Sequence, residues 1–407
     1  MFSWTRRRSA TIFAVAFIFI AFFQAFVPES FRLDSSDYTF YYSVVARNLL
    51  AGNGFTLADG RFAAANPPGY PIIVAAILWL AQFGISEALL FGALNAACLA
   101  ISVVVVYRLS RNLWDERSGL LAAGLWLTYP FMLLLSTERL TEPPFISALY
   151  IGMAIFWHAL KTPTWHGFAL TAVFLGIAML LRSIAIAILP VCVLILLFSR
   201  CQWQTKLGGS AVLIGLGALI VAPWTLLIYV QTNQLVLLGT NSAPSVRDGL
   251  TFAVGKAYRQ EFPVSEDVIA LMERLLARRD DMNTLSAIVE VVGEESADDR
   301  GALAKLLAMK VVRSWYATDT GRFETIALLI QIAYLIPIGI GSLIAFRHVP
   351  HLRGYVFGVW LIVLYFWFMT FLVLSILRYM APVMGLLMTL APSALRIWRQ
   401  RPSAPLP

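Results

Sequence analysis

The residues best suited to chemistry lie in one acidic and aromatic stretch, RLDSSDYTFYYSVVARNLL, which follows the first long apolar run. Its two aspartates, Asp34 and Asp37, are three residues apart. At this spacing one helical turn places both carboxylates on the same face, so one could act as a base and the other could support it. An aspartate before an amphipathic segment is also a good helix N-cap. Spacing alone favours a capping role for one aspartate and leaves open whether either aspartate acts as a base.

Three further charged residues stand beside apolar runs. Glu142 is followed by two prolines in LTEPPF, Arg182 lies in MLLRS, and Arg378 lies in ILRYMAP. Charged groups at membrane depth are costly and tend to be functional. A guanidinium binds phosphate through two parallel hydrogen bonds, although a single arginine can also snorkel to lipid headgroups. Two arginines on the side of the acidic stretch predict an anionic, lipid-linked ligand.

The composition is that of a polytopic membrane protein. Of the 407 residues, 59% are hydrophobic and 13% are charged, whereas a soluble domain is about 25% charged. The net charge of +8 comes from basic residues scattered at the ends of apolar runs, without a basic stripe, so we expect no nucleic-acid partner. The three cysteines and four histidines form no ligand pattern, and no phosphate-binding glycine loop is present.

The apolar runs predict an all-α bundle of about ten membrane-spanning helices. The candidate spans are 11–27, 88–107, 119–135, 143–160, 167–182, 183–199, 208–229, 323–346, 354–374 and 379–398. The short apolar segment 67–84 is expected to be an interfacial helix, because the short loops on one side of the membrane then carry the arginines and lysines, as the positive-inside rule requires. Both termini then lie in the cytoplasm.

Three regions follow from these spans. Residues 1–229 form an N-terminal membrane module whose first outer loop, 28–87, carries the candidate site. Residues 230–322 contain 13 of the 23 acidic residues and predict a small outer helical region, with one helix starting after Ser265 and another around Leu303 and Leu306. Residues 323–407 supply the last membrane helices and a short cytoplasmic tail.

Several short motifs occur along the chain in a fixed order. They are DYTFYYSVVARNLLAGNGF (37–55), NPPGYPII (66–73), YRLSRNLWDERSGLLAAGLWLTYP (107–130), TEPPF (141–145), LLRS (180–183), APWTLLIY (222–229), GTNSA (239–243) and RYMAP (378–382). In this order they resemble the GT-C superfamily of integral-membrane glycosyltransferases, in particular the bacterial branch related to protein O-mannosyltransferases and lipid A aminoarabinose transferases.

The resemblance implies an inverting transferase in the bacterial cytoplasmic membrane, with its site facing the periplasm or cell exterior. The donor would be a hexose or pentose on polyprenyl phosphate. The acceptor would be the hydroxyl of a glycolipid, a polysaccharide or a protein, with membrane lipid as a further partner. No cofactor is required, although a divalent cation at Asp37 and Glu142 is permitted.

The resemblance also assigns roles to residues. Asp37 becomes the general base with Asp34 in support, and Tyr38 stands where a second acidic residue often follows. Glu142 becomes a second acidic site. The resemblance assigns binding of the donor phosphate to Arg182, Arg378 and Tyr379. It assigns substrate binding to Tyr41, Tyr42, Tyr70 and Asn66. The three tyrosines could equally belong to an interfacial aromatic belt.

Two rival functions stay open. A lipid or sugar transporter or flippase is also polytopic and polar inside, although no inverted repeat is visible in the sequence. An O-antigen-ligase-like enzyme, which acts on a diphosphate-linked glycan, would share the arginines but would need no aspartate in the first loop.

Overall fold

The chain is described by a computed structural model that covers residues 6–28, 35–254 and 261–395. These residues are helical and contain no strand beyond one isolated bridge between Thr56 and Phe62. The expected all-α class is therefore confirmed. The chain divides into two compact units, of which the first comprises residues 1–239, 340–361 and 384–407, and the second residues 240–339 and 362–383.

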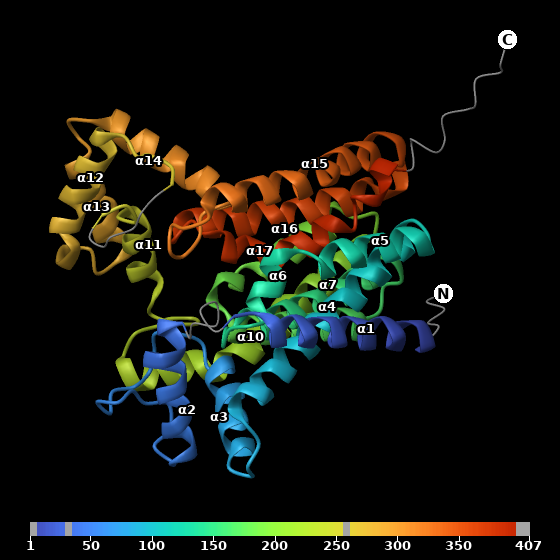
Figure 1. Cartoon of the computed structure of the whole chain (residues 1–407), viewed down its shortest axis with the longest axis horizontal. Helices are drawn as coiled ribbons and strands as arrows, with labels where there is room; N and C mark the ends of the chain where they lie inside the picture. Colours follow the sequence, from blue (N-terminus) through green and yellow to red (C-terminus); the bar gives the residue numbers. More distant parts are fainter. Residues whose placement is uncertain (1–5, 29–34, 255–260, 396–407) are drawn as a thin grey trace. The chain divides into compact units, whose positions relative to one another are not determined.

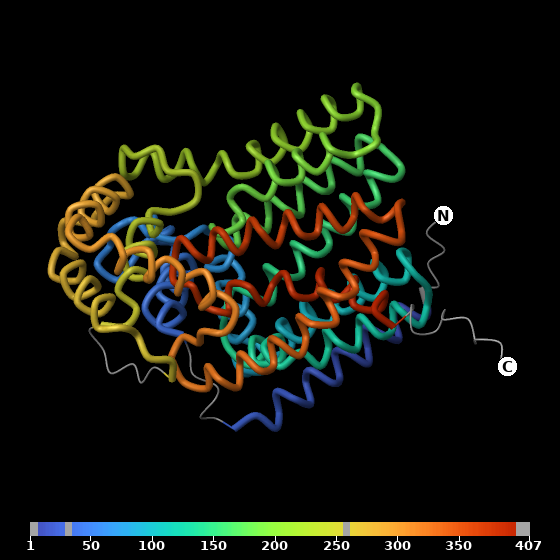
Figure 2. The backbone as a smooth tube through the Cα atoms, turned by 90° about the horizontal axis from the view of Figure 1, so that it is seen from above, coloured from blue at the N-terminus to red at the C-terminus, as the bar shows by residue number. Residues whose placement is uncertain are grey.

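The first unit is built on long apolar helices that lie alongside one another, as Figures 1 and 2 show. α4 packs against α1, α5 and α7, while α8 packs against α7 and α10. Its helices are α1 (Arg6–Phe26), α2 (Ser43–Leu50), α3 (Gly69–Ala81), α4 (Glu87–Leu113), α5 (Glu116–Leu127), α6 (Pro130–Leu135), α7 (Glu142–Lys161), α8 (Trp165–Leu181), α9 (Ile188–Phe198) and α10 (Trp203–Thr232).

The second unit contains four shorter helices, namely α11 (Ser242–Leu250), α12 (Glu266–Ala277), α13 (Leu285–Glu295) and α14 (Arg300–Arg313). Three further helices have residues in both units: the long helices α15 (Glu324–His348) and α16 (Arg353–Leu372) and the shorter α17 (Leu377–Met388). The expected helix after Ser265 is confirmed as α12, although the Ser265 side chain makes no cap hydrogen bond to it. The limits of the three regions drawn from the sequence stay a prediction.

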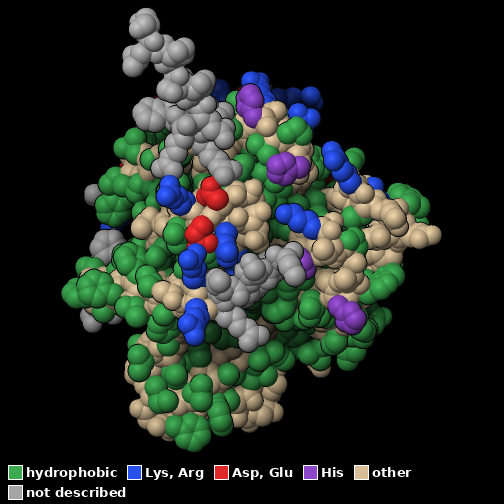
Figure 3. Space-filling model, turned by 90° about the vertical axis from the view of Figure 1, so that its right-hand side faces the viewer, with side chains coloured by type: hydrophobic (Ala, Val, Ile, Leu, Met, Phe, Trp, Pro, Cys, Tyr) green, Lys and Arg blue, Asp and Glu red, His purple; other side chains and the backbone are tan. Residues whose placement is uncertain are grey.

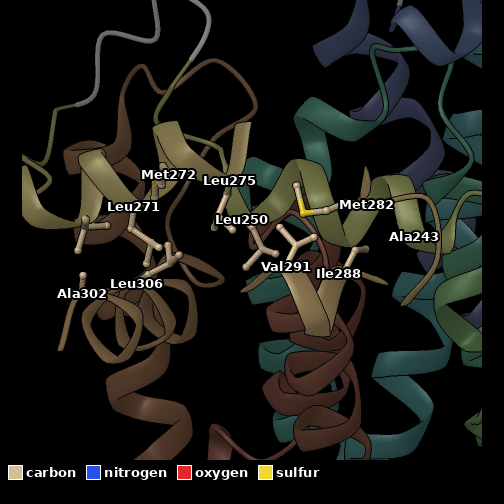
Figure 4. Close-up of a cluster of buried hydrophobic side chains, with 11 residues drawn as sticks. Ala243, Leu250, Leu271, Met272, Leu275, Met282, Ile288, Val291, Ala302 and Leu306 are labelled. Carbon is tan, nitrogen blue, oxygen red and sulfur yellow. The ribbon is translucent and has the colours of Figure 1, made fainter. Parts of the chain in front are cut away.

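A small apolar core holds α11 to α14 together. Leu271 of α12 lies beside Leu306 of α14, Leu275 of α12 lies beside Leu250 of α11, and Ile288 and Val291 of α13 lie near Met282 (Figure 4). The buried positions on α12 recur at three- and four-residue intervals, which is the spacing of one helix face. Most acidic and basic residues of this region lie at its surface, whereas Lys310 and Arg313 of α14 are buried.

Six helices are long and apolar enough to cross a membrane: α1, α4, α7, α10, α15 and the segment Pro350–Leu372 that contains α16. Four other expected spans are shorter or broken in the described structure. α8, α9 and α17 are shorter apolar helices, and the expected span 119–135 is interrupted between α5 and α6. The interruption falls at Tyr129, whose extended backbone is what the following Pro130 favours. The count of ten spans therefore stays a prediction.

The segment 67–84 forms α3, which has only 13 residues. It lies beside α2, and both run across the direction of α1 (Figure 1). A helix of this length is too short to cross a bilayer core about 30 Å thick. The structure thus supports the interfacial placement of this segment.

Candidate active site

A buried ion pair joins the start of α7 to the end of α8. The Arg182 guanidinium contacts the Glu142 carboxylate and donates a hydrogen bond of 3.0 Å to the Thr141 hydroxyl. The Glu142 side chain is 1% exposed and that of Arg182 is 12% exposed. Because a buried carboxylate is costly unless it is paired, the two side chains hold each other in one orientation. The second acidic residue expected from the sequence is therefore the partner of the expected phosphate-binding arginine.

Asp37 stands at the start of a π-helical turn, Tyr38–Tyr42, that leads into α2. Its side chain is exposed and makes no cap hydrogen bond. Instead the Ser35 hydroxyl accepts a hydrogen bond of 3.1 Å from the Tyr38 N–H. The cap that spacing favoured is therefore wrong for Asp37, because the helical turn already begins at Ser36 and the Ser35 side chain caps it, so that Asp37 lies inside the first turn. Asp34 lies outside the described residues.

Tyr42 connects this turn to the ion pair. Its ring meets the ring of Tyr70 edge to face, with the centroids 4.9 Å apart. Burial raises the pKa of the Tyr42 hydroxyl, the negative charge of Asp37 raises it further, and the positive charge of Arg182 acts against both. Glu142 also raises this pKa. The Tyr42 hydroxyl is thus within electrostatic range of Asp37, Glu142 and Arg182, which lie far apart in the sequence.

Tyr41 has a different position from Tyr42. Its hydroxyl donates to the Ala63 carbonyl at 2.7 Å and accepts from the Asn66 N–H at 3.1 Å. Burial raises the pKa of Tyr41 to about 12, against the opposing effect of hydrogen bonds to the backbone. The structure therefore places Tyr41 and the backbone of Asn66 in the packing of the loop before α3.

Arg139 is a residue near the site that sequence reasoning did not select. Its guanidinium donates a hydrogen bond of 3.1 Å to the Tyr38 hydroxyl and lies 4.9 Å from the centre of that ring. It also lies 5.2 Å from the ring of Phe91 and 3.7 Å from the Glu87 carboxylate. Stacking of a guanidinium on two rings contributes about 0.5–2 kcal/mol per contact. Arg139 thereby fixes the residue that follows Asp37.

Arg378 and Tyr379 belong to the second unit. Arg378 pairs with the Asp319 carboxylate at 3.4 Å, and its guanidinium lies 5.5 Å from the centre of the Tyr379 ring. Tyr379 packs against a small cluster that includes Tyr316 and Ile376. The first unit thus brings together Asp37, Glu142, Arg182, Tyr42 and Tyr70, and Arg378 and Tyr379 contact residues of their own unit.

The residues beside Glu142 offer little to a divalent cation. Its carboxylate is already neutralised by Arg182, and the described residues contain no group of three or more His, Cys, Asp or Glu side chains that could hold a metal ion. Hard cations such as Mg²⁺ prefer several oxygen ligands. The cation at Asp37 and Glu142 stays a prediction, and the described donor set does not fit it.

Comparison with known families gives one match to a family model. Residues 65–227 match the model of dolichyl-phosphate-mannose-protein mannosyltransferases. The matched segment includes Asn66, Tyr70, Glu142 and Arg182, whereas Asp37 and Arg378 lie outside it.

Curated relatives match over a similar stretch. An undecaprenyl phosphate-alpha-4-amino-4-deoxy-L-arabinose arabinosyl transferase of Pseudomonas aeruginosa is 28% identical over 151 residues, which is 35% of this chain and 27% of the relative. Such a transferase of Pseudomonas fluorescens is 26% identical over 190 residues, which is 43% of this chain and 34% of the relative. The matches thus span about a quarter to a third of the length of these relatives.

Solved structures resemble the whole chain in fold. The apo oligosaccharyltransferase of Archaeoglobus fulgidus matches 98% of this chain and 52% of its own, with a TM-score of 0.60 at 14% identity. A second structure is the archaeal oligosaccharyltransferase AglB from Archaeoglobus fulgidus, in complex with an inhibitory peptide and a dolichol-phosphate. Its TM-score is 0.59 at 14% identity, and the match covers 100% of this chain and 53% of that protein's chain. The family-model match thus covers residues 65–227, and the solved structures show that the chain shares its fold with these oligosaccharyltransferases.

Proposed function

We propose that the chain is an inverting glycosyltransferase that moves a sugar from a polyprenyl-phosphate donor to an acceptor hydroxyl. One observation carries the proposal. The largely buried guanidinium of Arg182 is held by Glu142 and Thr141 at the end of α8, and its charge and that of the exposed Asp37 carboxylate both act on the pKa of the buried Tyr42. A base for the acceptor and a cation for a phosphate leaving group are the two parts that such a transfer requires.

In the proposed reaction Asp37 takes the proton from the acceptor hydroxyl. The acceptor oxygen then forms a bond to the anomeric carbon, and the bond from that carbon to the phosphate oxygen breaks on the opposite face. The electron pair leaves with polyprenyl phosphate, whose charge Arg182 stabilises. A phosphate is a good leaving group without a proton, so no second acid is required. Arg378 is a further candidate for the donor phosphate.

Glu142 has a positioning role in this scheme. Its carboxylate holds the Arg182 guanidinium together with Thr141, so that the cation does not turn toward the Asp37 carboxylate. Tyr70 and Tyr42 present two edge-to-face rings beside this pair and are candidates to pack on the sugar. We place this site on the outer side of the membrane, because the loops at the opposite helix ends carry most of the basic residues of the first unit.

The test of this function is Asp37→Asn in proteoliposomes that contain a polyprenyl-phosphate-linked sugar. We expect the rate of transfer to fall by about 10²–10⁴-fold, which is the usual contribution of a general base. Asp59→Asn is the matched control, because Asp59 is an exposed aspartate of the same loop that pairs with Arg61. Full activity of Asp37→Asn would remove the base and would favour a ligase-like enzyme. Uptake without a covalent product would favour a transporter.

The sugar is a pentose or a hexose. The curated relatives are named for an arabinosyl transfer and the family model for a mannosyl transfer. Mass spectrometry of envelope glycolipids from cells with and without this chain would separate the two by the mass added to the acceptor.

A further inference from the structure

A cavity of about 230 Å³ opens at the end of the first unit where α4 and α7 finish and α16 begins. α7 carries Glu142 at its first residue and borders this cavity with its last turn, so the cavity and the candidate active site lie at opposite ends of a 20-residue helix. At 1.5 Å per residue that helix is about 30 Å long. The cavity is therefore separate from the site of transfer.

The lining of the cavity is apolar inside and cationic at the rim. Leu109, Ala154, Trp157 and Tyr355 form its wall, with the Trp157 and Tyr355 rings 4.7 Å apart. His158 and Lys161 are exposed and lie at its edge, together with Asn112 and Thr162. No acidic side chain is among the residues that line it. This combination suits a molecule with an anionic head and an apolar body.

A second cavity gives a direct comparison on the same unit. It measures about 240 Å³ and lies where α8 and α10 begin, with Thr164, Trp165, Gln204 and Thr205 in its lining. Its size matches that of the first cavity, but its lining contains no charged side chain. A cavity between helix ends can therefore form without basic residues in its lining. The positive charge at the first cavity is thus specific to that cavity.

The first cavity opens on a basic face of the molecule. Figure 3 shows lysine, arginine and histidine side chains gathered on this face and few acidic ones. A positive face and an apolar wall at the ends of membrane-spanning helices together attract anionic lipid headgroups, and basic pockets between such helices are where these headgroups bind. The cavity is smaller than the ~300–1,000 Å³ of a site for a drug-sized ligand. It has room for a headgroup, while the acyl chains would stay in the bilayer.

We propose that this cavity binds the phosphodiester headgroup of an anionic phospholipid. Lys161 and His158 contact the phosphate, and the side-chain amide of Asn112 donates a hydrogen bond to it. Trp157 and Tyr355 pack against the glycerol and the first part of an acyl chain. The competing explanation is that Lys161 and His158 only complement the negative end of the α7 dipole. That explanation predicts no preference for one lipid over another.

The test is native mass spectrometry of the full chain in detergent, titrated with phosphatidylglycerol and, separately, with phosphatidylcholine. The pocket variant is His158→Gln/Lys161→Gln. The control is His166→Gln/Arg200→Gln, which removes the same residue charges from exposed positions of the same face outside the cavity. One basic residue near an anionic lipid contributes about a fivefold effect on affinity. We expect phosphatidylglycerol to bind the pocket variant at least about fivefold more weakly and the control as tightly as wild type.

A second variant tests the cavity without altering charge. Ala154→Leu fills the wall and should weaken phosphatidylglycerol binding while both cations remain. Equal thermal unfolding midpoints of all variants in phosphatidylcholine would show that the loss is not misfolding, and a variant that fails this check is replaced by the single Lys161→Gln.

Three results would overturn the proposal. One is equal binding of the two lipids to wild type, and another is an equal loss in the control variant. The third is displacement of phosphatidylglycerol by millimolar inorganic phosphate, which would assign the cavity to a soluble anion.

Discussion

At the scale of single residues, the pairing of Glu142 with Arg182 decides what each can do. Sequence reasoning selected both, one as an acidic landmark and one as a phosphate ligand, and the structure joins them. Their pairing could not be predicted, because it depends on how the start of α7 meets the end of α8, 40 residues later. The cap at Asp37 was mispredicted for a local reason, since the helical turn begins at Ser36 and is capped by Ser35.

The pairing predicts a strong dependence between two substitutions. Glu142→Gln or Arg182→Gln alone leaves an uncompensated buried charge, and each should lower the free energy of unfolding by ~3–5 kcal/mol. The double variant should cost less than the sum, because it leaves neither charge behind. Denaturant unfolding of wild type, the two single variants and the double variant in detergent micelles measures the interaction between the two side chains. Additive costs would show that the two side chains do not hold each other.

At the scale of elements, most helices were predictable and their breaks were not. The apolar periodicity gave α12 and its buried face correctly, because Val268, Leu271 and Leu275 recur at helical spacing. The break between α5 and α6 depends on the dihedral angles that Pro130 imposes on Tyr129, which hydropathy does not report. The π-helical turn after Asp37 has no sequence pattern of its own, and such turns are frequent at functional sites.

One element predicts a pH dependence. Lys310 of α14 is buried and donates hydrogen bonds to the carbonyls of Gly249 and Val373 at 2.8 Å and 2.6 Å. Burial, with the nearby charge of Arg313, lowers the pKa of Lys310 from 10.5 to about 7. Between pH 7 and 10.5 the unfolded chain therefore binds more protons than the folded chain, so stability rises with pH there.

Lys310→Met should flatten this rise, whose slope is at most ~1.4 kcal/mol per pH unit for one proton. The measurement is the thermal unfolding midpoint between pH 7 and 9.5. Lys305→Met is the control, because Lys305 lies on the same helix, is exposed and pairs with Asp267 at 2.7 Å. A slope that is unchanged in Lys310→Met would mean that Lys310 keeps its proton in the folded protein.

At the scale of the whole molecule, charge gives the proposed orientation in the membrane. Basic residues gather at one end of the first unit, and the turn with Asp37 follows the other end of α1. Charge counts in short loops predicted this polarity from the sequence alone, because the positive-inside rule acts on composition and needs no tertiary contacts. The position of Asp37 relative to Arg182 within the first unit depends instead on tertiary packing, which composition does not encode.

The orientation can be checked with two engineered thiols. In a background where Cys98, Cys192 and Cys201 are replaced by alanine, Asp59→Cys should react with a membrane-impermeant maleimide from outside intact cells. His166→Cys should react only after the membrane is opened. Both positions are exposed and lie in the first unit. The reverse pattern would invert the proposed orientation.

Two glycines allow close backbone contacts beside the candidate site. A methyl group on Gly69 would lie 2.7 Å from the Leu180 carbonyl oxygen, and one on Gly239 would lie 2.4 Å from that of Ala65. Gly69 therefore allows the first turn of α3 to approach the end of α8 two residues before Arg182, and Gly239 allows the chain after α10 to approach the loop before α3. A larger residue at Gly69 would push the neighbouring Tyr70 away from the end of α8. The spacing of the candidate site thus depends on a residue that has no side chain of its own.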